Sequence, residues 1–268
     1  MLWDDFSQPI LHAHWTPTCI GGGQIAIADA TLILSFAAAQ QGHYTDAQID
    51  DYTGLPRTRF PWRPPLRMEV RARTSLPAAH IADVSHEHLR GTAGFGFWNY
   101  PFSVRGDILM LPEAIWFFYA SPPSNMALVP GIPGWGWKAQ VVHTLRTEAL
   151  TALLPTTLAI GWARATGATQ TAARWLQRLS GASEVLLTAD MTQWHTYALE
   201  WRAHQARFWV DDVLVLTVAN PPTRPLGFVA WLDNQYAIAT PRGVLRFGTV
   251  ASGPQQLELA FIKIEPLH

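Results

Sequence analysis

The 268-residue chain is long enough for one large β domain, and 49% of its residues are apolar, so a sizeable core can form. Charged residues make up only 15% and the formal net charge is -1, which argues against a polyanionic partner such as nucleic acid. The 13 tryptophans are the unusual count, and such rings either fill a core or line a ligand groove.

Cysteine content and the N-terminal segment bear on the compartment. Cys19 is the only cysteine, so no disulfide can form within the chain. The segment MLWDDFSQPI has neither the basic nor the apolar region of a signal peptide, and no apolar run reaches the roughly 20 residues that span a bilayer. We expect a cytoplasmic protein without a membrane partner, or a secreted one if a leader has been trimmed. These features leave the oligomeric state open.

Short strands separated by turn residues follow one another along most of the chain. Residues 24–36 predict two strands around an Ala-Asp-Ala turn, and residues 66–74 alternate between apolar and polar positions, as a strand with one buried face does. This succession indicates a β-sandwich, formed as a single domain by residues 1–268. Further strands are predicted at 92–100, 114–120, 194–201, 206–210, 213–218, 226–232, 244–247 and 257–264.

The middle of the chain has a different pattern. The piece TAARWLQRLSG (171–181) places apolar residues at helical spacing and ends on Gly181, a suitable C-cap. A second helix is predicted over 146–154, where Pro155 stops it. We therefore expect a helical insertion around 143–182 that caps an edge or face of the sandwich.

The stretch WHTYALEWRAHQARFWVDDVLV (194–215) has the pattern of a three-stranded meander with a tight hairpin at Asp211–Asp212. It resembles the meander of concanavalin A-like jelly rolls, in particular the laminarinase-like family-16 glycoside hydrolases. Residues 3–15 (WDDFSQPILHAHW) resemble the Asp-Asp-Phe start of these domains, and residues 66–73 (LRMEVRAR) resemble their Phe-Glu-x-Arg-x-Lys strand. The resemblance implies an all-β, concanavalin A-like jelly-roll sandwich of two antiparallel sheets, with a concave face that binds a saccharide.

In that family one strand carries Glu-x-Asp-x-x-Glu, and the strand in this place here is LPEAIWFFYASP (111–122). If Glu113 stands at the first acid, Ile115 and Phe118 occupy the other two positions. At most one acid of three is therefore present, whereas the family's double displacement needs two carboxyls about 5–5.5 Å apart. Alternation separates Trp116 and Phe118 from Ile115, so one half of the strand belongs to the core and the other half can form an aromatic wall.

Aromatic and amide side chains are the first candidates for ligand contacts. Sugar rings stack on flat aromatic faces, and an apolar small molecule fits the same kind of surface. The segment GIPGWGWK (131–138) is glycine-rich and is predicted as a loop that presents its two tryptophans. The alternative is that these rings are core residues. The predicted substrate-binding residues are Trp98, Asn99, Tyr100, Trp116, Trp135, Trp137, Asn234 and Tyr236.

Asp233 is the carboxylate predicted as a catalytic general base. It lies in WLDNQYA (231–237), directly after an apolar strand, where polar residues either form a turn or face a ligand. Asp50 is predicted as its catalytic partner across the groove, with Asp51 as the alternative. Both lie in the segment 43–52, and the resemblance implies that this strand borders the concave sheet.

No cofactor or metal ligand is predicted. His86 and His88 flank a glutamate at a spacing that a metal tolerates, but no further ligands lie near them in the sequence, which favours a solvated loop. A single structural Ca²⁺ held by loop carbonyls would leave no motif and stays open.

Three classes of function remain open. The first is a carbohydrate-active protein that binds a saccharide on an aromatic concave face and, if it is an enzyme, hydrolyses it with Asp233 and Asp50. The second is a small-molecule enzyme or carrier, with an apolar pocket under the insertion lined by Trp98, Trp116 and Trp135. The third is a non-catalytic module with an exposed aromatic patch.

Overall fold

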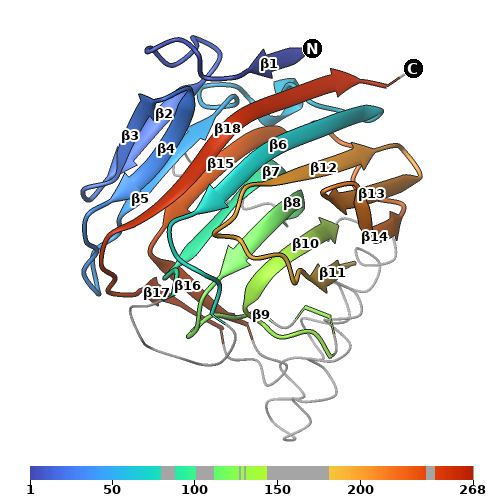
Figure 1. Cartoon of the computed structure of the whole chain (residues 1–268). Coiled ribbons are helices and arrows are strands. Elements are labelled where there is room, and N and C mark those ends of the chain that lie inside the picture. Colours follow the sequence, from blue (N-terminus) through green and yellow to red (C-terminus); the bar gives the residue numbers. More distant parts are fainter. Residues whose placement is uncertain are drawn as a thin grey trace, which may run out of the picture.

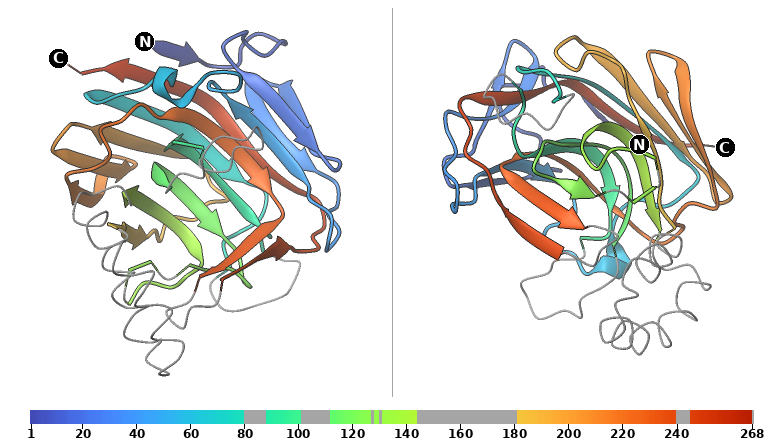
Figure 2. Two further views of the ribbon diagram at one scale, coloured as in Figure 1. Left: turned by 180° about the vertical axis from the view of Figure 1, so that it is seen from behind. Right: turned by 90° about the horizontal axis from the view of Figure 1, so that it is seen from below.

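The computed structural model describes residues 1–79, 88–100, 112–126, 128–129, 131–143, 181–239 and 245–267. Two large antiparallel sheets pack face to face in this part of the chain (Figure 1; Figure 2). The predicted all-β sandwich is therefore confirmed. The predicted helical insertion lies outside the described residues, apart from its ends.

The first sheet has eight strands, in the order β14-β13-β12-β6-β18-β4-β3, with β1 paired to β18. Its pairings are all antiparallel. Its strands are β1 (Leu2–Asp4), β3 (Gln24–Ala28), β4 (Thr31–Phe36), β6 (Leu66–Thr74), β12 (His195–Trp201), β13 (Gln205–Val210), β14 (Val213–Ala219) and β18 (Gln255–Pro266).

The second sheet has seven strands, in the order β11-β10-β8-β7-β15-β5-β2. Its strands are β2 (Thr16–Ile20), β5 (Asp46–Asp50), β7 (Thr92–Trp98), β8 (Glu113–Ala120), β10 (Gly136–His143), β11 (Ser183–Leu186) and β15 (Gly227–Asp233). A small third sheet contains β9 (Asn125–Met126), β16 (Gln235–Ala239) and β17 (Leu245–Thr249), and a 3-10 turn, η1, spans Arg57–Arg59.

Local sequence accounts for much of the eight-stranded sheet. Strand β6 buries Leu66, Met68 and Val70, while the intervening charged side chains form ion pairs on the outer face, such as Arg67 with Glu69 at 2.8 Å. The predicted hairpins are also present. The turn between β13 and β14 contains Asp211 and Asp212, whose positive φ angles of 47° and 67° are typical of a two-residue turn of this kind.

Aromatic rings from both sheets form the core between the layers. Phe95 and Phe117 of the seven-stranded sheet pack against Tyr197, with ring centroids 5.3 and 5.0 Å apart. Phe97 packs on Trp201 at 5.5 Å. Each of these rings is at most 1% exposed, so their burial is a major stabilising contribution to the sandwich.

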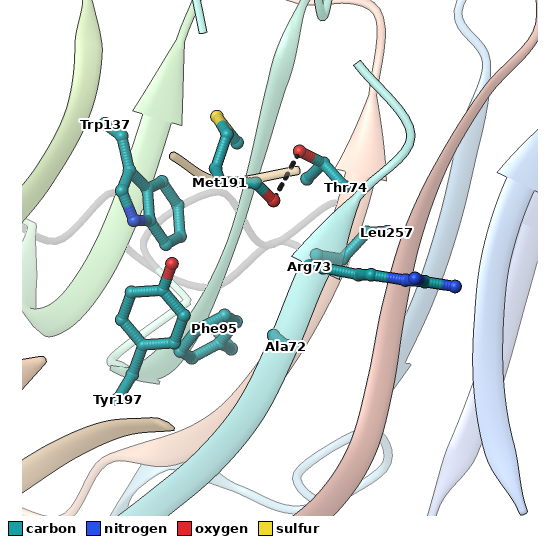
Figure 3. A pocket seen from close by; sticks show the side chains of 8 residues that line it. All are labelled: Ala72, Arg73, Thr74, Phe95, Trp137, Met191, Tyr197 and Leu257. Atoms are coloured by element: carbon teal, nitrogen blue, oxygen red, sulfur yellow. Dashed lines mark hydrogen bonds between the residues drawn. The ribbon is translucent and has the colours of Figure 1, made fainter. Parts of the chain in front are cut away.

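The structure corrects the prediction that Trp137 binds a ligand from a loop. Gly136 begins β10, and the Trp137 side chain is 3% exposed within the core, 5.7 Å from the ring of Phe95 and 5.5 Å from that of Tyr197 (Figure 3). The cavity beside it measures only about 10 Å³, about the space of one water molecule. Trp137 is therefore a core residue, because Gly136 begins a strand at a point that the sequence predicts as a loop.

Candidate functional site

The outer face of the seven-stranded sheet carries an aromatic cluster. Gly94 of β7 lies opposite Trp231 of β15 on one side and opposite Phe118 of β8 on the other. Two residues further along β7, Gly96 lies opposite Trp116 of β8. Trp116 contacts Phe118 and Trp231 with ring centroids 5.3 and 5.1 Å apart. We call this group the aromatic cluster; it contains Tyr52, Phe60, Trp98, Tyr100, Trp116, Phe118 and Trp231.

Two glycines of β7 make room for these rings. A Cβ atom at Gly94 would lie 2.8 Å from Cη2 of Trp231, and one at Gly96 would lie 2.6 Å from Cβ of Trp116. Larger residues at either position would push the indole rings off the sheet. The glycine-rich pattern of 92–98 is therefore what allows the tryptophans of the neighbouring strands to lie across β7.

The outward face of β8 carries no carboxylate. Its outward side chains are those of Ala114, Trp116, Phe118 and Ala120, since Ile115, Phe117 and Tyr119 point into the core between the sheets. Glu113 is 2% exposed and its Oε1 lies 3.3 Å from Nε2 of His143. Burial raises the pKa of Glu113. If Glu113 stands at the first acid position of the family, that position is buried at the start of β8 and does not lie on the outward face.

Two carboxyl groups do face one another on this side of the sheet, on other strands. Asp233, at the end of β15, is paired directly with Asp46, at the start of β5. Side chains at directly opposed positions have Cβ atoms about 4.5–5.5 Å apart. Asp46 is 3% exposed and Asp233 is 5% exposed, and Oδ1 of Asp46 is buried with no hydrogen-bond partner among the described residues. We call these two residues the carboxyl pair.

The two members of the carboxyl pair have different proton affinities. Burial, together with the charge of Asp233, raises the pKa of Asp46 to about 8. Burial raises the pKa of Asp233 only to about 6, because hydrogen bonds from Thr92 and Gln235 stabilise its ionised form. The Tyr44 hydroxyl hydrogen-bonds to the pair and favours the ionised forms. Near neutral pH, Asp46 therefore holds a proton while Asp233 is ionised.

Hydrogen bonds connect the carboxyl pair to the aromatic cluster. Thr92 Oγ1 donates to Oδ1 of Asp233 at 2.7 Å and accepts from Nε1 of Trp231 at 2.9 Å. Thr92 and Gln235 also donate their backbone N–H groups to the same carboxylate oxygen, at 3.2 and 3.0 Å. The Trp231 ring is thus connected to the carboxyl pair through the Thr92 hydroxyl.

The predicted partner of Asp233 is placed elsewhere by the register. Asp50 lies opposite Val229, four residues along β5 from Asp46, or roughly 13 Å at the usual rise per residue. Its carboxylate accepts four hydrogen bonds, from the backbone N–H groups of Tyr52 and Thr53 and from the side chains of Gln48 and Thr53. Asp50 therefore organises the turn after β5 and does not lie opposite Asp233 in the sheet.

The carboxylate of Asp51, the alternative partner, also has hydrogen-bond partners within the protein. It accepts hydrogen bonds from Nε1 of Trp62 and from the backbone N–H of Phe228, and its Oδ2 lies 3.6 Å from Nε2 of His14. Burial raises its pKa. These contacts tie the segment after β5 to β15 and leave the side chain within the protein.

The predicted amide residues have structural roles. Asn234 is fully buried; its Oδ1 accepts from the backbone N–H of Thr45, and its Nδ2 donates to the carbonyls of His43 and Val250 at 2.9 and 3.0 Å. Asn99 is 4% exposed and its Oδ1 accepts from the backbone N–H of Glu113. Both amides therefore hold backbone segments in place.

The remaining predicted residues divide into two groups. Trp98 and Tyr100 belong to the aromatic cluster, with ring centroids 5.3 Å apart, and Nε1 of Trp98 donates to the Tyr52 hydroxyl at 2.8 Å. Tyr236 lies in the small third sheet, where its ring covers Gly248. Trp135 lies just before β10 and is partly buried, and its role stays a prediction.

Sequence reasoning missed Asp46 and the polar residues of β10 and β11. Asp46 shares the parity of Gln48 and Asp50, so alternation alone could have placed it on the same face. Lys138, Gln140 and Glu184 were hidden by the interpretation of 131–138 as a loop. The signal for them was weak, because a polar residue in a buried strand is recognisable only once its partner on another strand is known.

Other features of the described residues bear on the alternative functions. A cavity of about 380 Å³ lies between β11 and β14, and Trp98, Trp116 and Trp135 do not line it. Within the described ranges, no helix has the length and apolar character needed to cross a membrane. Among the same residues, no group of three or more His, Cys, Asp or Glu side chains is arranged to hold a metal ion.

The two stacked sheets and their order define a concanavalin A-like jelly roll, and comparisons with known proteins agree. The sequence profile of Glycosyl hydrolases family 16 matches residues 165–235. No curated protein sequence matches the chain. This profile confirms the predicted resemblance to family 16, and the solved structures below confirm the fold.

Several solved structures share the fold over nearly the whole chain. A structure reported for endo-acting O-glycanases of the human gut microbiota, which initiate mucin breakdown, has a TM-score of 0.56 at 12% identity, covering 100% of this chain and 99% of that one. A pseudo beta-1,3-glucanase and immunostimulatory antigen of Mycobacterium tuberculosis has a TM-score of 0.51 at 12% identity, covering 100% and 99%. The endo-beta-1,3-glucanase of Pyrococcus furiosus has a TM-score of 0.50 at 10% identity, covering 98% and 92%. At these identities the similarity shows the fold alone.

Proposed function

We propose that the protein binds a saccharide on the aromatic cluster of the seven-stranded sheet. The observation that carries this proposal is the contiguous set of rings on the outward face of β7, β8 and β15, where Trp98, Tyr100 and Trp116 are only partly buried. Flat aromatic faces are suited to the C–H faces of sugar rings. The similar folds of glycan-degrading enzymes are consistent with a saccharide at this face, although they show only the fold.

The outward face of β8 argues against the double displacement of family 16. Trp116 and Phe118 are the large outward side chains of this strand, so on this face it offers contact area and no carboxylate. Binding by this strand therefore does not require that it takes part in hydrolysis. The pseudo-glucanase of Mycobacterium tuberculosis, as described, shows that such a fold is not restricted to active glucanases.

Thermal shift and calorimetry with oligosaccharides test the proposal. β-Glucan and galactan oligosaccharides would be compared with a panel of apolar metabolites, since a ligand well above its Kd raises the melting temperature by mass action. Trp116→Ala should weaken saccharide binding at least ten-fold, or about 1.4 kcal/mol. Trp209→Ala is the matched control, because Trp209 is also partly buried but contacts Arg67 on the other sheet.

The outcomes separate the classes of function. Stabilisation by oligosaccharides that is lost only in the Trp116 variant would support the proposal. Stabilisation by apolar compounds alone would contradict it and favour a small-molecule carrier. No stabilisation by either panel, with binding only to another protein, would favour an interaction module.

Hydrolysis of the bound saccharide is the second candidate, and the carboxyl pair favours it. Directly opposed residues place their Cβ atoms about 4.5–5.5 Å apart, close to the carboxyl separation of retaining glycosidases. Asp46, which holds a proton near neutral pH, would protonate the leaving oxygen as the glycosidic bond breaks. The Asp233 carboxylate would attack the anomeric carbon and form a glycosyl ester. Asp46, ionised by the first step, would then take a proton from the water that hydrolyses this ester and releases the sugar.

Release of reducing ends from the bound oligosaccharides tests this second candidate. Asp46→Asn and Asp233→Asn should each lower turnover by at least a hundred-fold, since each removes one of two groups that act in the same step. Glu113→Gln should leave turnover nearly unchanged, because Glu113 lies off the outward face. Binding without turnover in the unaltered protein would exclude hydrolysis and leave the binding proposal intact.

A further inference from the structure

A chain of polar contacts ends at the edge of the aromatic cluster. It contains Trp116 of β8, Lys138 and Gln140 of β10, and Glu184 of β11. In the register Trp116 lies directly opposite Gln140, which lies directly opposite Glu184. Because directly opposed residues point to the same face of a sheet, these side chains lie together on the outer face.

Each contact in the chain is short. Nε1 of Trp116 donates to Oε1 of Gln140 at 2.8 Å, and Nε2 of Gln140 donates to Oε2 of Glu184 at 2.6 Å. Oε1 of Glu184 lies 3.2 Å from Nζ of Lys138, which also donates to the carbonyl of Pro133. The Gln140 carboxamide thus lies between a donor, the Trp116 indole, and an acceptor, the Glu184 carboxylate. Only one of the two orientations of the amide forms both hydrogen bonds.

Burial holds the polar members in place. Lys138 and Gln140 are each 2% exposed and Glu184 is 7% exposed, whereas Trp116 is only partly buried. Burial lowers the pKa of Lys138, and the charge of Glu184 counteracts this change. A buried ion pair acts as a unit, because removal of one partner leaves the other charge without water or a counter-ion.

We propose that Gln140, held by the Lys138–Glu184 ion pair, is a positioning residue that fixes the ring plane of Trp116 for stacking on a saccharide. The inference rests on the proposed function for its ligand, but the fixed indole is a property of the unliganded protein. Without Gln140 only packing against neighbouring rings restrains the indole, so binding must restrict more of its motion. Gln140, Lys138 and Glu184 therefore influence affinity without touching the ligand.

A double-mutant cycle between positions 140 and 116 tests the inference. Gln140→Met keeps a similar volume but removes the acceptor for the indole, and Trp116→Phe keeps a ring but removes the N–H donor. Gln140→Met should weaken oligosaccharide binding about five- to ten-fold in the unaltered background. The same substitution should change affinity less than two-fold in the Trp116→Phe background, because the contact that it removes is already absent.

A second readout needs no ligand. Near-UV circular dichroism reports how tryptophan rings are fixed in the folded protein. Gln140→Met should change this spectrum in the unaltered background and leave it nearly unchanged in the Trp116→Phe background. If no oligosaccharide binds, the proposed function fails, and this spectral cycle still decides the inference about the indole.

A second substitution that rescues Lys138→Met can distinguish a positioning role of the ion pair from a general effect on stability. Lys138→Met should weaken binding, because it leaves Glu184 buried without its counter-ion and free to pull away from Gln140. Lys138→Met combined with Glu184→Gln should restore affinity to within about two-fold, since an amide at 184 still offers an oxygen to Nε2 of Gln140. Should Lys138→Met fail to fold, the double variant and the cycle at 140 and 116 remain.

Two results would overturn the inference. One is an equal loss of affinity and an equal spectral change on Gln140→Met in both backgrounds, which would make Gln140 a structural residue that does not act through Trp116. The other is a rescued, stable double variant at 138 and 184 whose affinity stays as low as that of Lys138→Met.

Discussion

Asp46→Asn should make the protein more resistant to alkaline conditions. Asp46 is 3% exposed, and burial together with the charge of Asp233 raises its pKa from 3.8 to about 8. In the unfolded chain this group ionises near its ordinary value. Between these two values the folded state holds a proton that the unfolded state has lost, so the free energy of unfolding falls as pH rises. The penalty is nearly absent below pH 4 and complete above pH 8.

The size of the effect follows from the two pKa values. One pKa unit corresponds to about 1.4 kcal/mol, so the full penalty is roughly 6 kcal/mol, and roughly 3 to 4 kcal/mol of it develops between pH 5 and pH 8. Asparagine cannot ionise, and its amide has nearly the shape of the protonated carboxyl. Relative to the unaltered protein, Asp46→Asn should therefore gain roughly 3 to 4 kcal/mol on going from pH 5 to pH 8.

Urea unfolding at several pH values between 5 and 8 measures this difference. Asp29→Asn is a suitable control, because Asp29 is exposed in the turn between β3 and β4. Burial also raises the pKa of Asp51. This residue should therefore make both the unaltered protein and the Asp46 variant less stable as pH rises, and its contribution cancels in the difference between them. An identical pH dependence in the variant and the unaltered protein would refute the reasoning, because Asp46 would then ionise equally easily in both states.

Three further substitutions test other parts of the structure. Gly94→Ala should lower the free energy of unfolding by about 1–3 kcal/mol in urea, because its Cβ would lie 2.3 Å from the Phe117 carbonyl oxygen; Gly253→Ala, with nothing within 4 Å, should change it little. Trp137→Ala should cost about 3–5 kcal/mol while the folded variant keeps its saccharide affinity, and a selective loss of affinity would contradict its place in the core. Asp50→Ala should cost about 1–3 kcal/mol because it leaves backbone N–H groups unpaired, and an unchanged melting temperature would argue against this role.

Local patterns in the sequence were enough for the elements that alternate or turn sharply. The strand 66–74 buries every second residue, and the Asp211–Asp212 hairpin needs only two residues with positive φ, so both could be predicted from a few neighbouring positions. Strand β10 could not, because Lys138 and Gln140 interrupt its apolar pattern. Their burial depends on Glu184, which is far away in the sequence, and this partner is visible only in the folded protein.

The sequence was enough to predict which face of the sheet carries the candidate acids, but not which two of them lie opposite each other. Asp233 and the alternation of 43–52 placed acids on one side of the seven-stranded sheet. Asp46 and Asp50 share that side, and only the register between β5 and β15 decides which of them faces Asp233. That register depends on the whole sheet and on the core beneath it, so no local pattern could choose between the two acids.

The place of β18 has a consequence for how the chain reaches this fold. β18 lies in the middle of the eight-stranded sheet, between β6 and β4, and Ser35 pairs with Gln256 across nearly the whole sequence (Figure 1). Until residues 255–266 have left the ribosome, β4 and β6 each have an open edge that could pair with another chain. Such distant pairing is slow to form. Aggregation of newly made chains should therefore be most sensitive to substitutions that weaken β18, even where the finished protein tolerates them.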